Sequence, residues 1–165
     1  MTTRIIPSPI GRIRLTADDG AIIGLHLHEP PYNAGEEEPE GRSGDDACLD
    51  LAAEQLAQYF ERSRDTFDLP LRAAGTPFQM EVWAELQRIP YGTVISYGEL
   101  ARRVGRPRAA RAVGSANGAN PIAVIIPCHR VIAADGGVGG YGYGIERKQI
   151  LLELETSTGG EGREL

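Results

Sequence analysis

The chain has 165 residues, of which 41% are hydrophobic and 24% charged, and its formal net charge is −6. This composition is typical of a globular protein with one ordinary domain or two small ones. No stretch is apolar over the ~18 residues that a membrane span needs, and the first residues lack the apolar run of a secretory signal. We therefore expect a cytoplasmic protein with no membrane partner.

The cysteine count limits the redox and metal chemistry. Cys48 and Cys128 can form at most one disulfide, and a free Cys128 suits the reducing cytoplasm. His26 and His28 share a face of a predicted strand, but together with Cys48 they form a poor ligand set for zinc. We expect neither a bound metal nor a cofactor.

The negative charge is concentrated in the first part of the chain. Residues 1–71 carry 6 basic and 14 acidic groups, whereas residues 72–155 carry 10 basic and 7 acidic groups. A local basic surface can bind a phosphate backbone even on an acidic protein, because screening makes the nearest charges decisive. A solvated helix face would explain the same charges equally well. The basic cluster of residues 96–111 contains five arginines: Arg102, Arg103, Arg106, Arg108 and Arg111.

The first half of the chain predicts a small α/β unit. Residues 10–17 alternate in hydropathy and residues 21–28 return after an Asp-Asp-Gly turn, which predicts a β-hairpin. Residues 29–46 are rich in Pro, Gly and Glu and predict a flexible loop. Apolar side chains over residues 49–60 recur at three-to-four spacing, as in an amphipathic helix. Residues 66–72 form a short extended connection.

The second half predicts several well-delimited helices. Residues 76–79 (Thr-Pro-Phe-Gln) supply an N-cap, a proline at the first helical position and a capping-box glutamine. Residues 96–99 (Ser-Tyr-Gly-Glu) form a second capping box, which opens a short helix that Gly105 ends. Pro107 then begins a helix over residues 108–117. Two short helices with this spacing form either a helix-turn-helix or a plain αα-corner. The helix that starts at residues 76–79 is expected to bury Phe78, Val82, Leu86 and Ile89.

The helix over residues 108–117 is almost bare of the long polar side chains that read base edges. Its small side chains would let the backbone approach DNA closely without reading sequence. Arg111, which stands between alanines, either reaches solvent or probes the duplex. A helix of this kind suits a protein that must find damage in any sequence.

The run Pro127-Cys128-His129-Arg130, which aliphatic residues flank on both sides, is the strongest chemical signal. Cationic neighbours can favour the nucleophilic thiolate, although most buried cysteines are inert. Residues 122–126 predict a buried strand that delivers Cys128. Residues 139–144 alternate glycine with tyrosine and predict the wall of a pocket for a flat ligand, because the Lys-Ser/Thr of a phosphate loop is missing. The closing helix, residues 145–155, is expected to pack through Ile150, Leu151 and Leu154.

Together these segments resemble the O6-alkylguanine-DNA alkyltransferase family, of the bacterial stand-alone type. The resemblance implies an RNase-H-like α/β domain over residues 1–72, a mainly α domain with a helix-turn-helix over residues 73–156, and a flexible tail over residues 157–165. It runs from about Thr76 to Glu155 and rests on residues 95–97, 109–114, 120–121, 126–131 and 140–141.

The resemblance implies direct DNA repair by a single-turnover methylated-DNA–protein-cysteine methyltransferase. A guanine alkylated at O6 would flip out of the duplex, and its alkyl group would pass irreversibly to Cys128. His129 would act through a water as general base, with Glu155 orienting it, and Tyr97 would donate a proton to the leaving base. Asn120 would tie the recognition helix to the active-site turn.

The resemblance also implies the contacts to DNA and to the base. The carbonyls of Cys128 and Val131 and the amides near Tyr141 and Gly142 would read the guanine, with Lys148 supporting the pocket. Tyr143 stands where some relatives have glycine, so we expect a pocket that is narrower toward bulky alkyl groups. Arg111 would fill the gap left by the flipped base, on a DNA surface that includes Ser96, Ala109, Ala110 and Ser115.

The partner implied is double-stranded DNA containing O6-alkylguanine, bound by a monomer, with cooperative assembly on the DNA left open. The alternatives are a lesion-binding relative or a helix-turn-helix regulator without transfer activity. Cys128 argues against the former, because such relatives lack the acceptor cysteine. The alanine-rich helix and the Cys-His pair argue against the latter. A thiol hydrolase would need an oxyanion hole, for which no motif is evident.

Overall fold

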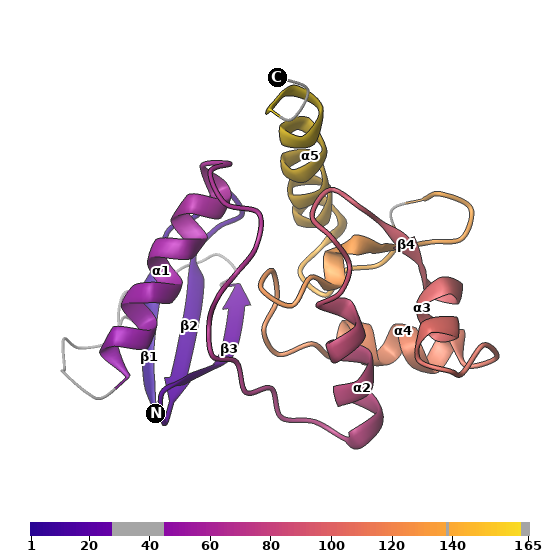
Figure 1. Cartoon of the computed structure of the whole chain (residues 1–165), viewed down its shortest axis with the longest axis horizontal. Coiled ribbons are helices and arrows are strands. Elements are labelled where there is room, and N and C mark those ends of the chain that lie inside the picture. Colours follow the sequence, from indigo (N-terminus) through magenta and orange to yellow (C-terminus); the bar gives the residue numbers. More distant parts are fainter. Residues whose placement is uncertain (28–44, 138, 163–165) are drawn as a thin grey trace. The chain divides into compact units, whose positions relative to one another are not determined.

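The computed structural model describes residues 1–27, 45–137 and 139–162, with side chains through Thr156 (Figure 1). The chain forms two compact units, Met1–Ala74 and Gly75–Leu165. Most of the predicted loop, residues 29–44, lies outside the described residues, but Asp46 does not belong to a loop because it begins a helix. Within the described residues no helix is long and apolar enough to span a bilayer.

The first unit is a three-stranded antiparallel sheet that packs against one helix. The strands β1 (Thr2–Ile6), β2 (Ile13–Asp18) and β3 (Ala21–Leu27) lie in that order, and α1 (Asp46–Phe60) contacts all three. The β2–β3 hairpin occurs as predicted, with Asp18 opposite Ala21. Alternate β2 residues are fully buried, as expected for a sheet with one face on the core: Ile13, Leu15 and Ala17.

Of the two segments at the edges of this sheet, the sequence predicted one and not the other. The strand β1 was not predicted, because its five residues are all half-buried and show no alternation of apolar and polar side chains. The extended segment of residues 66–72 pairs with β3 in parallel at Leu71 and Ile22. Two hydrogen bonds hold it: the Ile22 N–H donates to the Pro70 carbonyl at 2.8 Å and the Arg72 N–H to the Ile22 carbonyl at 2.9 Å.

The second unit begins with α2 (Pro77–Leu86), which has the predicted start. The Thr76 hydroxyl accepts from the Gln79 N–H, and the Gln79 side chain accepts from the Thr76 N–H, so the capping box is complete. Val82, Trp83 and Leu86 are buried on one face. The Trp83 indole N–H donates to the Ala116 carbonyl at 2.8 Å, and its ring leaves no room for a side chain at residue 75, which is glycine.

The helix-turn-helix consists of α3 (Tyr97–Arg103) and α4 (Ala110–Gly118), which pack against each other and against α2. The Ser96 hydroxyl caps α3, while the Glu99 carboxylate accepts hydrogen bonds from Arg102 and Arg103. The prediction that Pro107 begins the second helix was wrong. Residues 106–109 form a turn closed by the Ala109 N–H and the Arg106 carbonyl, a turn whose second position suits proline.

Two short strands and the last helix complete this unit. β4 (Ile95–Ser96) pairs in parallel with β5 (Val131–Ile132), so the start of α3 lies beside the cysteine segment. The helix α5 (Ile145–Gly162) continues beyond Glu155, and residues 157–162 therefore are helical where a flexible tail was predicted. Ile150 is 38% exposed and does not pack as expected, whereas Leu151 and Leu154 are buried.

The predicted strand over residues 122–126 is wrong in conformation although right in burial. All five residues are buried, but the segment is a series of turns in which the Ile126 N–H bonds to the Ile122 carbonyl and Val124 has φ 71°. Continuous apolar runs do not distinguish a buried strand from a buried turn. The turns bring Cys128 back over the end of α4.

Candidate active site

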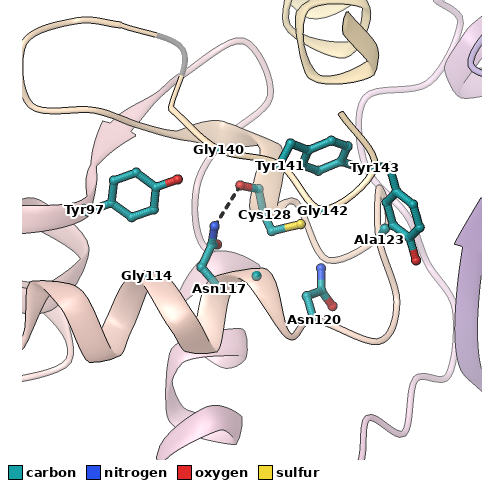
Figure 2. A pocket seen from close by; sticks show the side chains of 11 residues that line it. Tyr97, Gly114, Asn117, Asn120, Ala123, Cys128, Gly140, Tyr141, Gly142 and Tyr143 are labelled. Carbon is teal, nitrogen blue, oxygen red and sulfur yellow. Dashed lines mark hydrogen bonds between the residues drawn. The ribbon is translucent and has the colours of Figure 1, made fainter. Parts of the chain in front are cut away.

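A cavity of about 460 Å³ lies in the second unit, and Cys128 is part of its wall (Figure 2). The end of α4 forms one side of the cavity, and the start of α3 contributes Tyr97. The loop of residues 139–144, called the glycine–tyrosine loop below, forms the other side. The residues that line it include six that were predicted for the site: Tyr97, Asn120, Cys128, Tyr141, Gly142 and Tyr143. The remaining five are Gly114, Asn117, Gly118, Ala123 and Gly140.

Cys128 begins the 3₁₀ helix η2 (Cys128–Arg130) and is 6% exposed. Burial raises the pKa of its thiol above the ordinary value, while a hydrogen bond with Asn120 and the positive charge of Lys148 lower it. The idea that His129 and Arg130 supply cationic neighbours to the thiol needs correction. With three residues per turn, consecutive side chains of a 3₁₀ helix diverge, and both of these residues face Glu155 instead.

Glu155 is the centre of a buried polar cluster with His129 and Arg130. His129 Nε2 lies 2.7 Å from Glu155 Oε2, and Arg130 Nε and Nη2 donate to Oε1 and Oε2 at 2.9 and 3.0 Å. Arg130 Nη1 also donates to the Ile89 carbonyl at 2.6 Å. The guanidinium therefore makes the bidentate contact with a carboxylate that its planar shape favours, and it ties α5 to the segment that follows α2.

This cluster sets the protonation states of its members. Burial disfavours the charged carboxylate, but hydrogen bonds and charge from His129 and Arg130 prevail and lower the pKa of Glu155 to about 2. Burial is the largest cause that lowers the pKa of His129, and Arg130 and Lys148 add to it against the opposing effect of Glu155. A neutral His129 must then donate its Nε2–H to Glu155, which leaves a lone pair on the buried Nδ1. That nitrogen has no hydrogen-bond partner among the described residues.

Asn120 holds together the turn that precedes Cys128. Its Nδ2 donates to the Ile126 carbonyl at 2.7 Å, and its Oδ1 accepts from the Ile122 N–H at 2.9 Å. Asn120 is 8% exposed, and the Ile126 carbonyl also accepts from the Cys128 N–H at 2.8 Å, so these buried backbone groups are satisfied within the protein. The Asn120 side chain thus joins the segment that follows α4 to the turn before Cys128, and it also forms a hydrogen bond with the thiol.

Tyr97 and Lys148 meet at the glycine–tyrosine loop. Lys148 Nζ donates to the carbonyls of Val131 at 2.6 Å and Gly140 at 3.0 Å, and it lies 5.9 Å from the centre of the Tyr97 ring. Burial lowers the pKa of Lys148 to about 8. Burial also raises the pKa of the Tyr97 phenol, so this hydroxyl retains its proton at neutral pH.

The two carbonyls that were predicted to read guanine already have partners. The Cys128 carbonyl accepts from Asn117 Nδ2 at 3.4 Å, and the Val131 carbonyl accepts from Lys148. Val131 is fully buried and does not line the cavity. Tyr141 lines the cavity, and its ring packs edge-to-face against that of Tyr143, with the ring centres 5.9 Å apart. The Tyr141 hydroxyl has no hydrogen-bond partner within the described part of the chain.

Sequence reasoning missed two residues of the site. Arg130 was read as part of the cysteine motif, but its role depends on the direction imposed by η2. Asn117 is 4% exposed near the end of α4. The signal that could have found it is a polar side chain on the buried face of an otherwise apolar helix, three residues before Asn120.

The predicted DNA surface lies on α3 and α4. Arg111 and Ser115 are exposed on α4, Ala109 and Ala110 are half-exposed at its start, and Ser96 is half-buried beneath α3. Several arginines of the basic cluster make ion pairs: Arg102 and Arg103 with Glu99, and Arg106 with Glu81 at 3.8 Å. A shallow hollow lined by Arg106, Pro107, Arg108 and Ala109 lies at the N-terminal end of α4.

Comparison with known proteins identifies both units. Residues 1–73 match the ribonuclease-like domain of 6-O-methylguanine DNA methyltransferases, and residues 77–157 match the DNA-binding domain of the same proteins. The chain belongs to the 6-O-methylguanine DNA methyltransferase family. The expected fold class, an RNase-H-like α/β domain followed by a mainly α domain with a helix-turn-helix, is confirmed.

Similar members of this methyltransferase family cover almost the whole chain. A methylated-DNA–protein-cysteine methyltransferase of Mycolicibacterium paratuberculosis is 46% identical over 92% of this chain and 90% of its own length. One from Methanosarcina acetivorans is 42% identical over 93% of this chain and 97% of its own. The crystal structure of Mycobacterium tuberculosis OGT in complex with DNA superposes with a TM-score of 0.83 at 46% identity, covering 94% of this chain and 92% of that one.

Proposed function

We propose that this protein repairs DNA directly, by moving an alkyl group from O6 of guanine to its own Cys128. The observation that carries the proposal is the position of the Cys128 thiol, in the wall of a cavity behind the recognition helix α4 and beside a buried His129–Glu155–Arg130 cluster. Membership of the family supports it, because relatives that match over 92–93% of the chain are methylated-DNA–protein-cysteine methyltransferases. A regulator or lesion-binding protein would have no use for the nucleophile.

The reaction is a single displacement at the alkyl carbon. A bond forms from Cys128 Sγ to this carbon as its bond to O6 breaks, and the electron pair stays with the departing guanine. Tyr97, which retains its proton because burial raises its pKa, donates a proton to the base. The thiol proton passes through a water to His129 Nδ1, and Glu155 holds the imidazole in the required tautomer. The product thioether is stable, so each molecule reacts once.

The protonation states of the buried groups support an activation step at His129. In the free protein burial raises the pKa of the Cys128 thiol, so the thiolate has to be generated during the reaction. A neutral His129 can accept the proton, and the imidazolium that results lies against the ionised Glu155. The positive charge of Lys148 stabilises the negative charge on sulfur. Transfer is therefore expected to slow when His129 becomes protonated at low pH.

The DNA partner is a duplex that contains O6-alkylguanine, bound in the cytoplasm by a monomer. The small side chains of α4 let its backbone enter a groove, and Arg111 on the exposed face occupies the stack after the base leaves. Phosphate contacts from the exposed arginines would supply most of the affinity, so binding should fall steeply with salt and depend little on sequence.

The test is the intact mass of the protein after incubation with an oligonucleotide containing O6-methylguanine. One methyl group should be gained per molecule at one equivalent of DNA, and peptide mapping should place it on Cys128. Cys128→Ser should gain none and still bind the duplex. Cys48→Ser is the matched control, because Cys48 is also buried but lies in the first unit, and it should react like the unmodified protein. A methyl group on any other residue, or none, contradicts the proposal.

A further inference from the structure

The turn Pro90–Thr93, called the α2–β4 turn below, packs against the buried polar cluster of the active site, and the proposed reaction gives it no part. The Thr93 N–H donates to the Pro90 carbonyl at 3.1 Å, and Gly92 has φ 77°, as the third residue of a type II turn requires. Pro90, Gly92 and Thr93 are exposed, and Tyr91 is half-buried. The turn therefore lies at the surface of the second unit.

The α2–β4 turn and the residue before it make three contacts with the buried cluster. The Ile89 carbonyl accepts from Arg130 Nη1 at 2.6 Å. The Tyr91 ring lies over the same guanidinium, with its centre 5.7 Å from Arg130 Cζ. The Gly92 N–H donates to Glu155 Oε1 at 3.4 Å. Arg130 and Glu155 are 6% and 1% exposed, so this turn stands between the two buried charges and solvent.

The Gly92 N–H fits the hydrogen-bonding capacity of Glu155. An ionised carboxylate offers about four acceptor sites. Arg130 donates to two of them and His129 to a third, and Gly92 adds a fourth donor. Each carboxylate oxygen thus has two donors. A carboxylate held in this way cannot rotate away from His129 without losing several partners in a buried place, which is costly.

Glycine suits this position because of its backbone conformation and not because of space. A Cβ at residue 92 would meet only the Glu155 carbonyl oxygen, at the ordinary contact distance of 3.7 Å. A φ of 77° is, however, unfavourable for any residue with a side chain. The turn therefore uses glycine to direct a backbone N–H at the carboxylate.

We propose that Tyr91 and Gly92 are positioning residues for the general base: the α2–β4 turn fixes Glu155, and through it His129, in the orientation that leaves Nδ1 to accept the thiol proton. The inference rests on the proposed function and adds to it two residues that do not line the cavity. The Tyr91 ring keeps water from the guanidinium, which strengthens the contact between ring and cation, and the Gly92 N–H holds the carboxylate.

Opening the turn should change the titration of His129 in a defined direction. Charged groups on two elements act on the imidazole: Glu155 and Lys148 from α5, and Arg130 from η2. The turn itself contains no charged residue. Burial is the largest cause that lowers the pKa of His129, so water admitted to the cluster raises this pKa. Loss of the Gly92 donor leaves more of the carboxylate charge to act on the imidazole, which raises the pKa as well.

The first experiment follows the His129 ring by NMR as a function of pH in the full chain, and it needs no substrate. Tyr91→Leu removes the ring over Arg130, so the titration midpoint should move to higher pH and the share of the Nε2–H tautomer should fall. Tyr91→Phe is the control, because it keeps the ring and loses only a hydroxyl whose contact with the Leu154 carbonyl is 3.5 Å long. It should titrate like the unmodified protein.

A second pair of variants tests the Gly92 N–H independently of the ring. Gly92→Ala disfavours φ 77° and should turn the N–H away from Glu155, with the same upward movement of the His129 midpoint. Gly105→Ala is the matched control. Gly105 also has φ 77°, and a Cβ there would meet nothing within 4 Å, so this change introduces the same backbone strain at the end of α3. The His129 midpoint should stay in place.

Single-turnover rates with saturating duplex containing O6-methylguanine connect the titration to the reaction. On the acidic limb the rate should fall about threefold in Tyr91→Leu and in Gly92→Ala, the effect of one weak hydrogen bond, and the limb should follow the NMR midpoint. An unmoved midpoint in both variants, or an equal movement in Tyr91→Phe or Gly105→Ala, overturns the inference while leaving alkyl transfer standing. Failure of the unmodified protein to transfer the methyl group would instead overturn the proposed function.

Discussion

Replacing Arg130 by methionine tests whether the buried cluster both stabilises the second unit and tunes the base. The change removes two hydrogen bonds to Glu155 and one to the Ile89 carbonyl, while the methionine fills most of the volume. The side chains of Arg130 and Glu155 are 8% and 2% exposed, so solvent cannot replace the lost partner. Breaking a buried ion pair on one side costs about 3–5 kcal/mol of unfolding free energy.

The loss should depend on pH in a defined way. The pKa of Glu155 is lowered from 4.5 to about 2, so its ionised form stabilises the fold above pH 4.5 and this contribution is lost as the pH falls toward 2. The difference in stability between the unmodified protein and Arg130→Met should therefore be largest near neutral pH and shrink in acid. Without the Arg130 charge the pKa of His129 should rise, which moves the acidic limb of the rate profile to higher pH.

The assays are urea unfolding followed by circular dichroism between pH 3 and 8 and the pH dependence of methyl transfer. Arg88→Met is the matched control, because the Arg88 side chain is 76% exposed and lies 3.5 Å from Glu85, and an ion pair whose cation is open to solvent contributes less than about 1 kcal/mol. The double change Arg130→Met with Glu155→Met should regain stability but not activity. A loss in Arg130→Met no larger than that in Arg88→Met, with a superimposable pH profile, would refute the reasoning.

Three further predictions concern single side chains. Arg111→Ala should slow repair of duplex DNA by about tenfold or more but leave reaction with free O6-benzylguanine unchanged, because only the duplex requires a base to be unstacked at a few kcal/mol; equal slowing on both would mean a role in the fold. Tyr143→Gly should speed benzyl transfer and leave methyl transfer unchanged in a competition assay, and a slower benzyl reaction would mean that the ring stacks on the substrate. Lys148→Met should raise the pH midpoint of Cys128 alkylation by iodoacetamide, because the Lys148 charge lowers the pKa of that thiol. Lys148→Arg is the control, and an unchanged midpoint in Lys148→Met would contradict this explanation.

The sequence predicted elements best where the signal is local. The capping box at Thr76 and Gln79 and the hairpin of β2 and β3 depend on neighbouring residues alone, and both occur as predicted. The start of α4 was misplaced, because proline suits the second position of a turn as well as the first turn of a helix. The conformation of the segment before Cys128 was predicted wrongly, because it depends on hydrogen bonds that the Asn120 side chain donates to Ile126 and accepts from Ile122.

The sequence indicated which residues line the cavity better than it indicated where their side chains point. Cys128, Tyr97 and residues of the glycine–tyrosine loop line the cavity, and each belongs to a motif that is visible in the sequence. The direction in which His129 and Arg130 point follows from one 3₁₀ turn, and their shared partner Glu155 lies 25 or more residues away. Contacts of that separation leave no periodic trace in the sequence. The buried cluster around Glu155 and the hydrogen bond from Asn117 to the Cys128 carbonyl therefore required the structure.

The contact between Trp83 and the recognition helix α4 means that intrinsic tryptophan fluorescence can report on this helix. The chain contains a single tryptophan, which is 3% exposed and bonded through its indole N–H to the carbonyl of Ala116, the neighbour of Asn117. Indole emission responds to the polarity and hydrogen bonding of its surroundings, so any displacement of the end of α4 will change its wavelength or intensity. Stopped-flow fluorescence can thus time the response of this helix to DNA and to alkylation without an added label, and it reports on one unit of the chain alone.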